Sequence, residues 1–176
     1  MDQVTPSEDS LPLINSAFAC NAPTEIASEN LINEYVVLSH AFGPDTEISL
    51  KETLETAALA SRILRRKYFY GKSPHLLLTQ IFKIVGKRLW RVQADHTGMQ
   101  IALGILYVAE KGWWVALSPK VHALWYREGV LSQVAETKKS EQLFGQIKYV
   151  TPSEDTGNFK LGDRLLLTTN DLAATL

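Results

Sequence analysis

Hydrophobic and polar residues alternate in two stretches near the start of the chain, and this alternation predicts two strands. The segment 14–22, INSAFACNA, alternates well enough for a strand, and the segment 34–42, EYVVLSHAF, forms a more apolar one. Residues 1–12 carry proline, serine and acidic residues with little to bury, which predicts a flexible N-terminal tail. We therefore expect residues 13–176 to form a single folded domain.

After residue 42 the spacing of apolar residues becomes that of helices. Ser49 and Glu52 have the S-x-x-E spacing of a capping box, which predicts a helix start there, and Gly71 is a suitable stop. Ser73 and Pro74 predict a second start, with serine as cap and proline at the first helical position. The buried stripe expected for this second helix consists of Leu77, Ile81, Ile84, Val85, Leu89 and Val92.

The second half of the chain is dominated by strand patterns. The expected strands are 99–112, 113–126, 130–134, 147–150 and 164–169, with turns at 110–112 and 127–129 and a turn-rich link at 151–163. The order is two strands, two helices and then many strands. This order favours a layered α+β domain over a doubly wound parallel sheet, in which helices and strands alternate.

Composition adds few constraints to this picture. The 176 residues are 45% hydrophobic and 21% charged, as is ordinary for a globular protein, and no apolar run is long enough to cross a membrane. The lone Cys20 excludes an internal disulfide, and the N-terminus lacks the pattern of a signal peptide. We therefore expect a cytoplasmic protein.

Acidic and basic residues are unevenly distributed along the chain. Residues 1–56 contain ten acidic residues and one basic residue, whereas residues 57–94 contain nine basic residues and no acidic one. Such a block is either a solvated helix face or a surface that binds an anion. The candidate anion-binding face consists of Arg62, Arg65, Arg66, Lys83, Lys87, Arg88 and Arg91.

Motifs for common enzyme chemistry are missing. The sequence has no P-loop, no G-x-G-x-x-G, no H-E-x-x-H and no G-x-S-x-G, and its four histidines are scattered. Adjacent Trp113 and Trp114 lie on a predicted strand and must therefore face opposite sides of it. One of them can fill the core, and the other needs cover from a helix or from a partner.

Several segments, taken in order, make residues 14–176 resemble the PP2C-type, metal-dependent Ser/Thr protein phosphatases. EIASEN (25–30) stands where that family has Arg-x-x-Asn-Glu-Asp, and SHAFGP (39–44) stands at Ala-Asp-Gly-Met-Gly-Gly. PKVH (119–122) falls at the Gly-Asp-Ser-Arg hairpin, and LGDRLLLTTNDL (161–172) is similar to the strand that ends in Asp-Gly-Leu. The resemblance implies an α-β-β-α sandwich, incomplete at its C-terminus.

The resemblance also assigns site positions, and acidic residues are missing from them. Members of the family hold two divalent metals between carboxylates, and a metal-bound water attacks the phosphoryl group. The family's metal-binding aspartates correspond to Asn30, His40 and Asn170, the hairpin aspartate to Lys120, and the phosphate-binding arginine to Glu25. Amides and an imidazole cannot offset two dications, so these positions imply a degenerate site.

The resemblance therefore predicts a catalytically inactive pseudophosphatase, not an enzyme, with no cofactor and with a structural or regulatory role. The first alternative is an active phosphatase that binds Mg²⁺ or Mn²⁺ in a rearranged site made by Glu29, His40, Asp45 and Asp171. The second is a binding module that uses the basic helices; nucleic acid is a weaker candidate for its partner because the basic and aromatic residues are not interleaved. Missing terminal strands would leave a sheet edge open, so we expect a protein partner or self-association at that edge.

Overall fold

The computed structural model describes residues 16–21, 34–42, 46–65, 73–93, 98–109, 112–135, 142–160 and 162–169. Two helices and eight strands lie within these ranges. The helices are α1 (Thr46–Leu64) and α2 (Pro74–Gln93). The strands are β1 (Ser16–Asn21), β2 (Glu34–Phe42), β3 (Gln100–Ala109), β4 (Gly112–Leu117), β5 (Val121–Arg127), β6 (Val130–Val134), β7 (Ser153–Gly157) and β8 (Arg164–Thr169).

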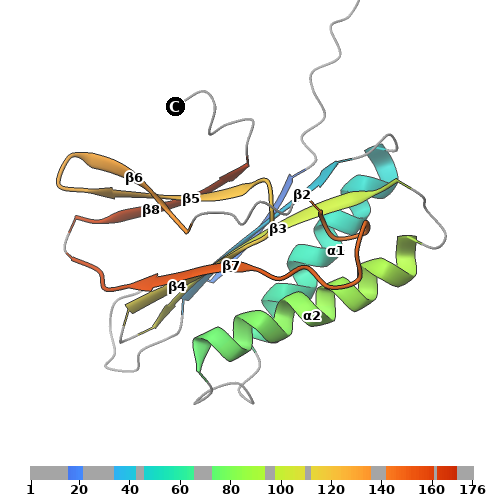
Figure 1. Cartoon of the computed structure of the whole chain (residues 1–176), viewed down its shortest axis with the longest axis horizontal. Coiled ribbons are helices and arrows are strands. Elements are labelled where there is room, and N and C mark those ends of the chain that lie inside the picture. Colours follow the sequence, from blue (N-terminus) through green and yellow to red (C-terminus); the bar gives the residue numbers. More distant parts are fainter. Residues whose placement is uncertain are drawn as a thin grey trace, which may run out of the picture.

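The strands form two antiparallel sheets. Sheet A has the order β1-β2-β3-β4-β7, and sheet B has the order β6-β5-β8. Figure 1 shows the two helices below sheet A and sheet B above it. The described residues thus form an α-β-β arrangement of layers, which confirms the predicted α+β class. The second helical layer of an α-β-β-α sandwich is not among them.

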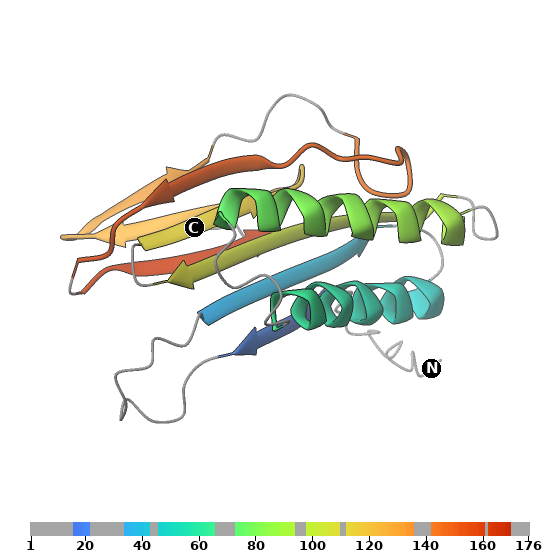
Figure 2. The same ribbon diagram turned by 90° about the horizontal axis from the view of Figure 1, so that it is seen from below.

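The helices cover one face of sheet A because their apolar stripes match that face. Figure 2 shows α1 and α2 side by side, running roughly along the strands of sheet A. Four residues of the predicted α2 stripe are buried, namely Leu77, Ile81, Val85 and Leu89, and Ile84 and Val92 pack against the same core. Phe82 in α2 meets Phe144, with 5.5 Å between the ring centroids. This apolar core contributes most to holding the helices on the sheet.

A second core lies between the two sheets. It contains Leu38, Leu106, Trp113 and Val121, together with Leu167 from β8. The sheets approach closely at Gly104 in β3, where an added Cβ would lie 2.6 Å from Val121 Cγ1. No ordinary side chain fits at that point, so the glycine permits the close packing of sheet B on sheet A.

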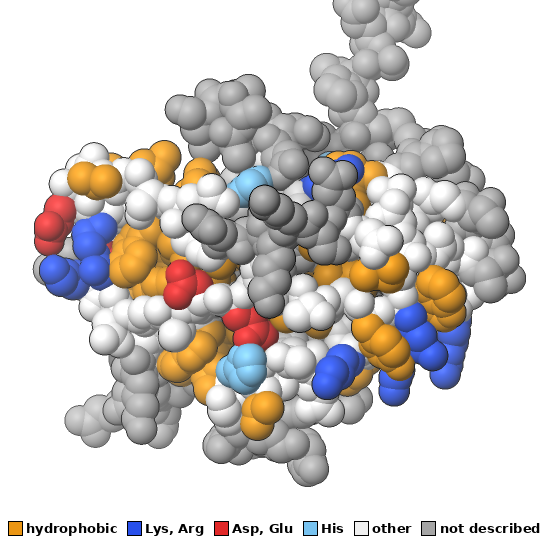
Figure 3. Space-filling model, in the orientation of Figure 1, with side chains coloured by type: hydrophobic (Ala, Val, Ile, Leu, Met, Phe, Trp, Pro, Cys, Tyr) orange, Lys and Arg blue, Asp and Glu red, His pale blue; other side chains and the backbone are white. Residues whose placement is uncertain are grey.

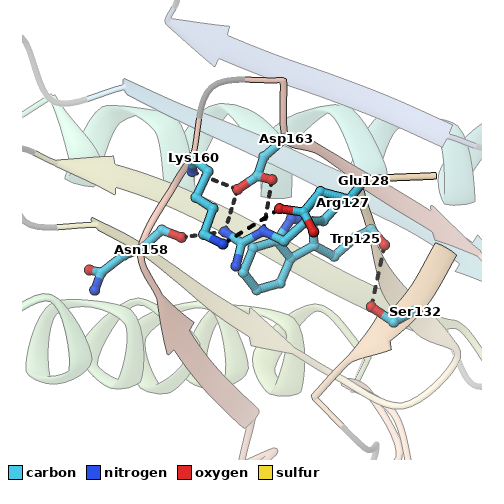
Figure 4. A network of polar contacts seen from close by, with 7 residues as sticks. All are labelled: Trp125, Arg127, Glu128, Ser132, Asn158, Lys160 and Asp163. Carbon is cyan, nitrogen blue, oxygen red and sulfur yellow. Dashed lines mark hydrogen bonds and ion pairs between the residues drawn. The ribbon is translucent and has the colours of Figure 1, made fainter. Parts of the chain in front are cut away.

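At the opposite end of sheet B, an ion pair joins the end of β5 to the residue before β8. The Arg127 Nε donates to Asp163 Oδ1 at 2.9 Å, and the Arg127 guanidinium carbon lies 4.0 Å from the centre of the Trp125 ring. Figure 4 shows the same guanidinium reaching the backbone carbonyl of Asn158, which follows β7. The Arg127 side chain, with the backbone N–H of Lys160, holds the pKa of Asp163 well below its usual range.

The predicted α2 start at Ser73 and Pro74 is confirmed, but the predicted start of α1 is wrong. The helix begins at Thr46, three residues before the capping-box serine. Ser49 is buried inside the helix, and its carbonyl accepts a hydrogen bond from Thr53 Oγ1 at 2.7 Å. Glu52 pairs with Arg88 of α2 rather than capping the helix. The helix also ends at Leu64, before the predicted stop at Gly71.

Two predicted strands in the second half are also corrected. Residues 113–126 form not one strand but two, β4 and β5, which belong to different sheets. The break falls at Ser118–Lys120, where Lys120 takes a left-handed φ of 64°. Residues 147–150 are not a strand, whereas the link predicted to be turn-rich contains β7, the end strand of sheet A.

Candidate functional site

Three segments that are far apart in the sequence meet at one end of the two-sheet core. β2 and β8 contact one another, although about 125 residues separate them. Val121 at the start of β5 pairs with Thr169 at the end of β8. Ser118 in the β4–β5 turn donates its backbone N–H to the carbonyl of Leu103 at 2.8 Å. The turn therefore lies beside the part of β3 that pairs with β2.

His40 is located at this end and faces the inter-sheet side. In β2, Leu38 lies in the inter-sheet core, whereas Val37 and Ala41 lie in the core beneath the helices. Side chains alternate along a strand, so His40 shares the face of Leu38 and Phe42. The rings of His40 and Phe42 meet edge to face, with 4.5 Å between their centroids. His40 is half-buried and so is accessible in part.

Lys120 brings a positive charge to the same place. Its Nζ lies 4.5 Å from the centre of the Phe42 ring, at the distance of a cation–π contact. The left-handed backbone at Lys120 directs the chain from sheet A into sheet B. His40, Phe42 and Lys120 form the part of the candidate site that the structure describes; we call these three residues the strand-end cluster.

Most of the other predicted site residues lie outside the described ranges. These are Glu25, Glu29, Asn30, Asp45, Arg66, Asn170 and Asp171. In the sequence, two of them come shortly after described strands: Asp45 follows β2 by three residues, and Asp171 follows β8 by two. Among the described residues, no three His, Cys, Asp or Glu side chains form a group that could hold a metal.

The predicted basic face is divided by the structure. Lys83, Lys87 and Arg91 are exposed on α2 at a spacing of four residues, which places them on one side of the helix. Arg88, by contrast, turns toward α1 and forms ion pairs with Glu52 and Glu55. Arg62 and Arg65 lie near the C-terminal end of α1, and the Arg65 Nε donates to the hydroxyl of Tyr35 at 2.5 Å.

The sequence reasoning overlooked Phe42 as a neighbour of both His40 and Lys120. An available signal was its spacing, since residues 40 and 42 of a strand share a face. It also overlooked a cavity beside α2 that is lined by His75, Trp114 and Glu154, and by Leu78 and Thr156. That cavity lies on the other face of sheet A. None of the described helices is long and apolar enough to cross a membrane.

Comparison with known proteins places this geometry in a recognisable fold. The sequence matches no protein-family model and no curated protein. Among solved structures, the serine/threonine phosphatase Stp1 from Staphylococcus aureus superposes with a TM-score of 0.70 at 13% identity, covering 100% of this chain and 83% of that one. The fold is PP2C-like.

Two further structures agree with this fold. The serine/threonine phosphatase of S. agalactiae superposes with a TM-score of 0.72 at 11% identity, covering 92% of this chain and 81% of that one. The catalytic domain of the phosphatase PstP, solved with two manganese ions, has a TM-score of 0.63 at 13% identity, covering 92% of this chain and 80% of that one.

These PP2C-like neighbours contradict two expectations. The chain was expected not to be an enzyme, but the structures that it resembles are serine/threonine phosphatases. It was expected to need no cofactor, but one of them holds two manganese ions. Both expectations rested on matching the family's metal- and phosphate-binding positions, by sequence order, to Glu25, Asn30, His40, Lys120 and Asn170. A shift of one residue toward the N-terminus replaces Asn30 by Glu29, and a shift in the opposite direction replaces Asn170 by Asp171, so no single shift restores both carboxylates.

Proposed function

We propose that this chain is a metal-dependent phosphatase whose site is rearranged around the strand-end cluster. The observation that carries the proposal is the meeting of β2, the β4–β5 turn and β8 at one end of a PP2C-like fold. In the sequence, Asp45 follows the end of β2 by three residues and Asp171 follows the end of β8 by two. The two manganese ions held by one neighbour of the same fold support a requirement for divalent metal.

The described residues do not fit a two-metal site by themselves. Of the strand-end cluster, His40 alone is a potential metal ligand, and Mg²⁺ or Mn²⁺ prefers several oxygen ligands. The proposal therefore assigns the remaining ligands to the carboxylates of Glu29, Asp45 and Asp171. The described side chains have a simpler role: Lys120 offers a positive charge that attracts a negatively charged phosphate ester.

Turnover of para-nitrophenyl phosphate with and without Mn²⁺ tests this proposal. We expect hydrolysis that depends on Mn²⁺ and falls roughly 100-fold in Asp171→Asn, because even residues that only orient a metal ligand contribute 10- to 100-fold. Glu128→Gln is the matched control, since Glu128 is an exposed carboxylate at the opposite end of β5 and should leave the rate unchanged. Folded wild-type protein without metal-dependent turnover would contradict the proposal.

A second function is favoured by the three exposed cations on α2. Lys83, Lys87 and Arg91 lie beside the exposed Trp90, so this helix presents both positive charge and an aromatic ring. We propose that this face binds an anionic partner. Binding to heparin-agarose should weaken steeply as salt rises and should be lost in the triple Lys83→Gln, Lys87→Gln, Arg91→Gln variant. Retention that does not respond to salt would argue against it.

A further inference from the structure

A cavity of about 370 Å³ lies between the N-terminal half of α2 and the strands β4 and β7. It is on the helix side of sheet A, away from the strand-end cluster. β3 lies between the strands that carry the two sites, so it gives their separation. Trp114 of β4 pairs with Tyr107 of β3, whereas His40 of β2 pairs with Ala102 of β3. At about 3.3 Å per residue these positions are roughly 17 Å apart along the strand, and they face opposite sides of the sheet.

The apolar wall of the cavity is Trp114, one of the two adjacent tryptophans that sequence analysis singled out. Trp113 is 1% exposed in the inter-sheet core, so Trp114 faces the helices. Its ring is only partly buried, packs at a tilt against Tyr107, and lies beside Leu78 of α2. The Trp114 ring therefore forms part of the cavity wall.

The polar wall comes from β7 and carries negative charge. Glu154 and Thr156 are two residues apart and so share the face that carries Trp114 and Ala116 in the paired strand. The cavity lining includes neither lysine nor arginine, and its negative charge comes from Glu154, because the Asp155 carboxylate accepts the backbone N–H groups of Ala135 and Thr156. Figure 3 shows a histidine beside acidic side chains in the region between β7 and α2, with basic side chains lying farther along α2.

The Glu154 carboxylate is held in place rather than left to move in solvent. Its Oε1 accepts a hydrogen bond from Thr79 Oγ1 at 3.0 Å, and its Oε2 contacts the Nδ1 of His75. The Glu154 side chain is 20% exposed, whereas the His75 side chain is 63% exposed. A carboxylate offers about four acceptor positions, so two remain for another donor. His75 can also swing away, because most of its ring is in solvent.

The strand that carries this carboxylate is an edge of sheet A. β7 pairs with β4 on one side, and no described strand pairs with its other side. An edge strand presents backbone N–H and C=O groups that can pair with an added strand. Side chains alternate along such an added strand, so its residue nearest to Glu154 and Thr156 would point toward the cavity.

We propose that an extended peptide pairs with the outer edge of β7 and places a lysine or arginine side chain in this cavity. The ammonium or guanidinium group pairs with Glu154, and its aliphatic stem packs on the Trp114 ring, where a cation is also attracted to the aromatic face. The fixed Glu154 carboxylate, in a lining without lysine or arginine, favours a basic peptide over an acidic one. The site is separate from the proposed phosphatase site and does not depend on it.

Titration with a blocked heptapeptide, acetyl-Thr-Val-Thr-Lys-Thr-Val-Thr-amide, tests the proposal by following the Trp114 indole signal in NMR spectra without metal. We expect saturable binding that weakens at least about 10-fold in Glu154→Gln, which corresponds to about 1.4 kcal/mol. His75→Ala should retain or increase the affinity, because His75 competes for the same carboxylate. Glu128→Gln is the control and should bind as the wild type does.

Three further results decide the proposal. Thr156→Lys should abolish binding, because it places a cation at the mouth of the cavity. This variant tests the same site if Glu154→Gln does not fold. The same peptide with glutamate in place of lysine should not bind; equal affinity would overturn the role of charge. If acetyl-lysine amide bound as tightly as the heptapeptide, the proposed pairing with β7 would be wrong. If the heptapeptide did not bind to the wild type, the whole proposal would be wrong.

Discussion

β3 in sheet A and β5 in sheet B are both rich in apolar residues, but they are buried differently. Residues 101–107 of β3 are buried without interruption. In β5, Val121 and Ala123 are buried whereas His122 and Leu124 are only partly so. Sheet A lies between the helices and sheet B, so both of its faces are covered. Among the described residues, sheet B is covered on one face only.

This difference explains the exposed apolar residues on sheet B. Tyr126 is 42% exposed, and its partners on the same face are Leu131 in β6 and Arg164 in β8. Leu166 on that face is 46% exposed. A strand in a sheet that is covered on both faces becomes continuously apolar, whereas one covered on a single face alternates. The stability of the two-sheet arrangement should therefore depend much more on sheet A than on the outer face of sheet B.

The largest expected effect comes from the core beneath the helices. Phe82 is fully buried against Phe144, so Phe82→Ala should lower the free energy of unfolding by about 3–5 kcal/mol. Leu131→Ala removes a side chain that is 53% exposed and should change it by no more than about 0.5 kcal/mol. Urea denaturation followed by circular dichroism measures both. A large loss in Leu131→Ala would show that the outer face of sheet B is covered in solution.

The next effect lies where the two sheets meet. Gly104→Ala would place a methyl group 2.6 Å from Val121 Cγ1, and it should destabilise the protein by about 1–3 kcal/mol. Val121→Ala removes the methyl groups that clash. The loss of stability in the double variant should therefore be smaller than the sum of the losses in the two single variants, by about 0.5 kcal/mol or more. Strict additivity in urea denaturation would contradict a direct contact between the sheets at this point.

The elements that could be predicted are those whose own hydrophobic pattern and flanking residues determine their structure. β2 and β8 have the predicted bounds, 34–42 and 164–169, because their apolar runs are flanked by polar residues and turns. α2 starts as predicted at Pro74, since the serine and proline before its stripe act locally. The turn at Glu128 and Gly129 is also local: both residues have positive φ, as a two-residue hairpin of this type requires.

The failures occurred where partners distant in sequence decide the structure. β7, with the sequence SEDTG, is polar because it is an edge strand, and its strand conformation comes from pairing with β4. Residues 147–150 have strand-forming side chains but gain only a bridge at Ile147. The inter-sheet face of His40 could be predicted from its spacing to Leu38. Its proximity to Lys120 could not, because the change of sheet at residues 118–120 is a tertiary feature.

The smallest expected effect concerns the ion pair between Arg127, at the end of β5, and Asp163, just before β8. The folded state lowers the pKa of Asp163 below its value of about 3.9 in an unfolded chain. The stabilisation from this carboxylate is therefore complete above about pH 5 and is lost as pH falls from about 4 toward the lower folded-state pKa. Asp163→Asn lacks it at every pH. In urea denaturation, the wild type should exceed Asp163→Asn in stability at pH 6, and the difference should shrink at pH 3. A difference that is the same at both pH values would mean that Arg127 binds the side chain of residue 163 through hydrogen bonds alone, without a contribution from its charge.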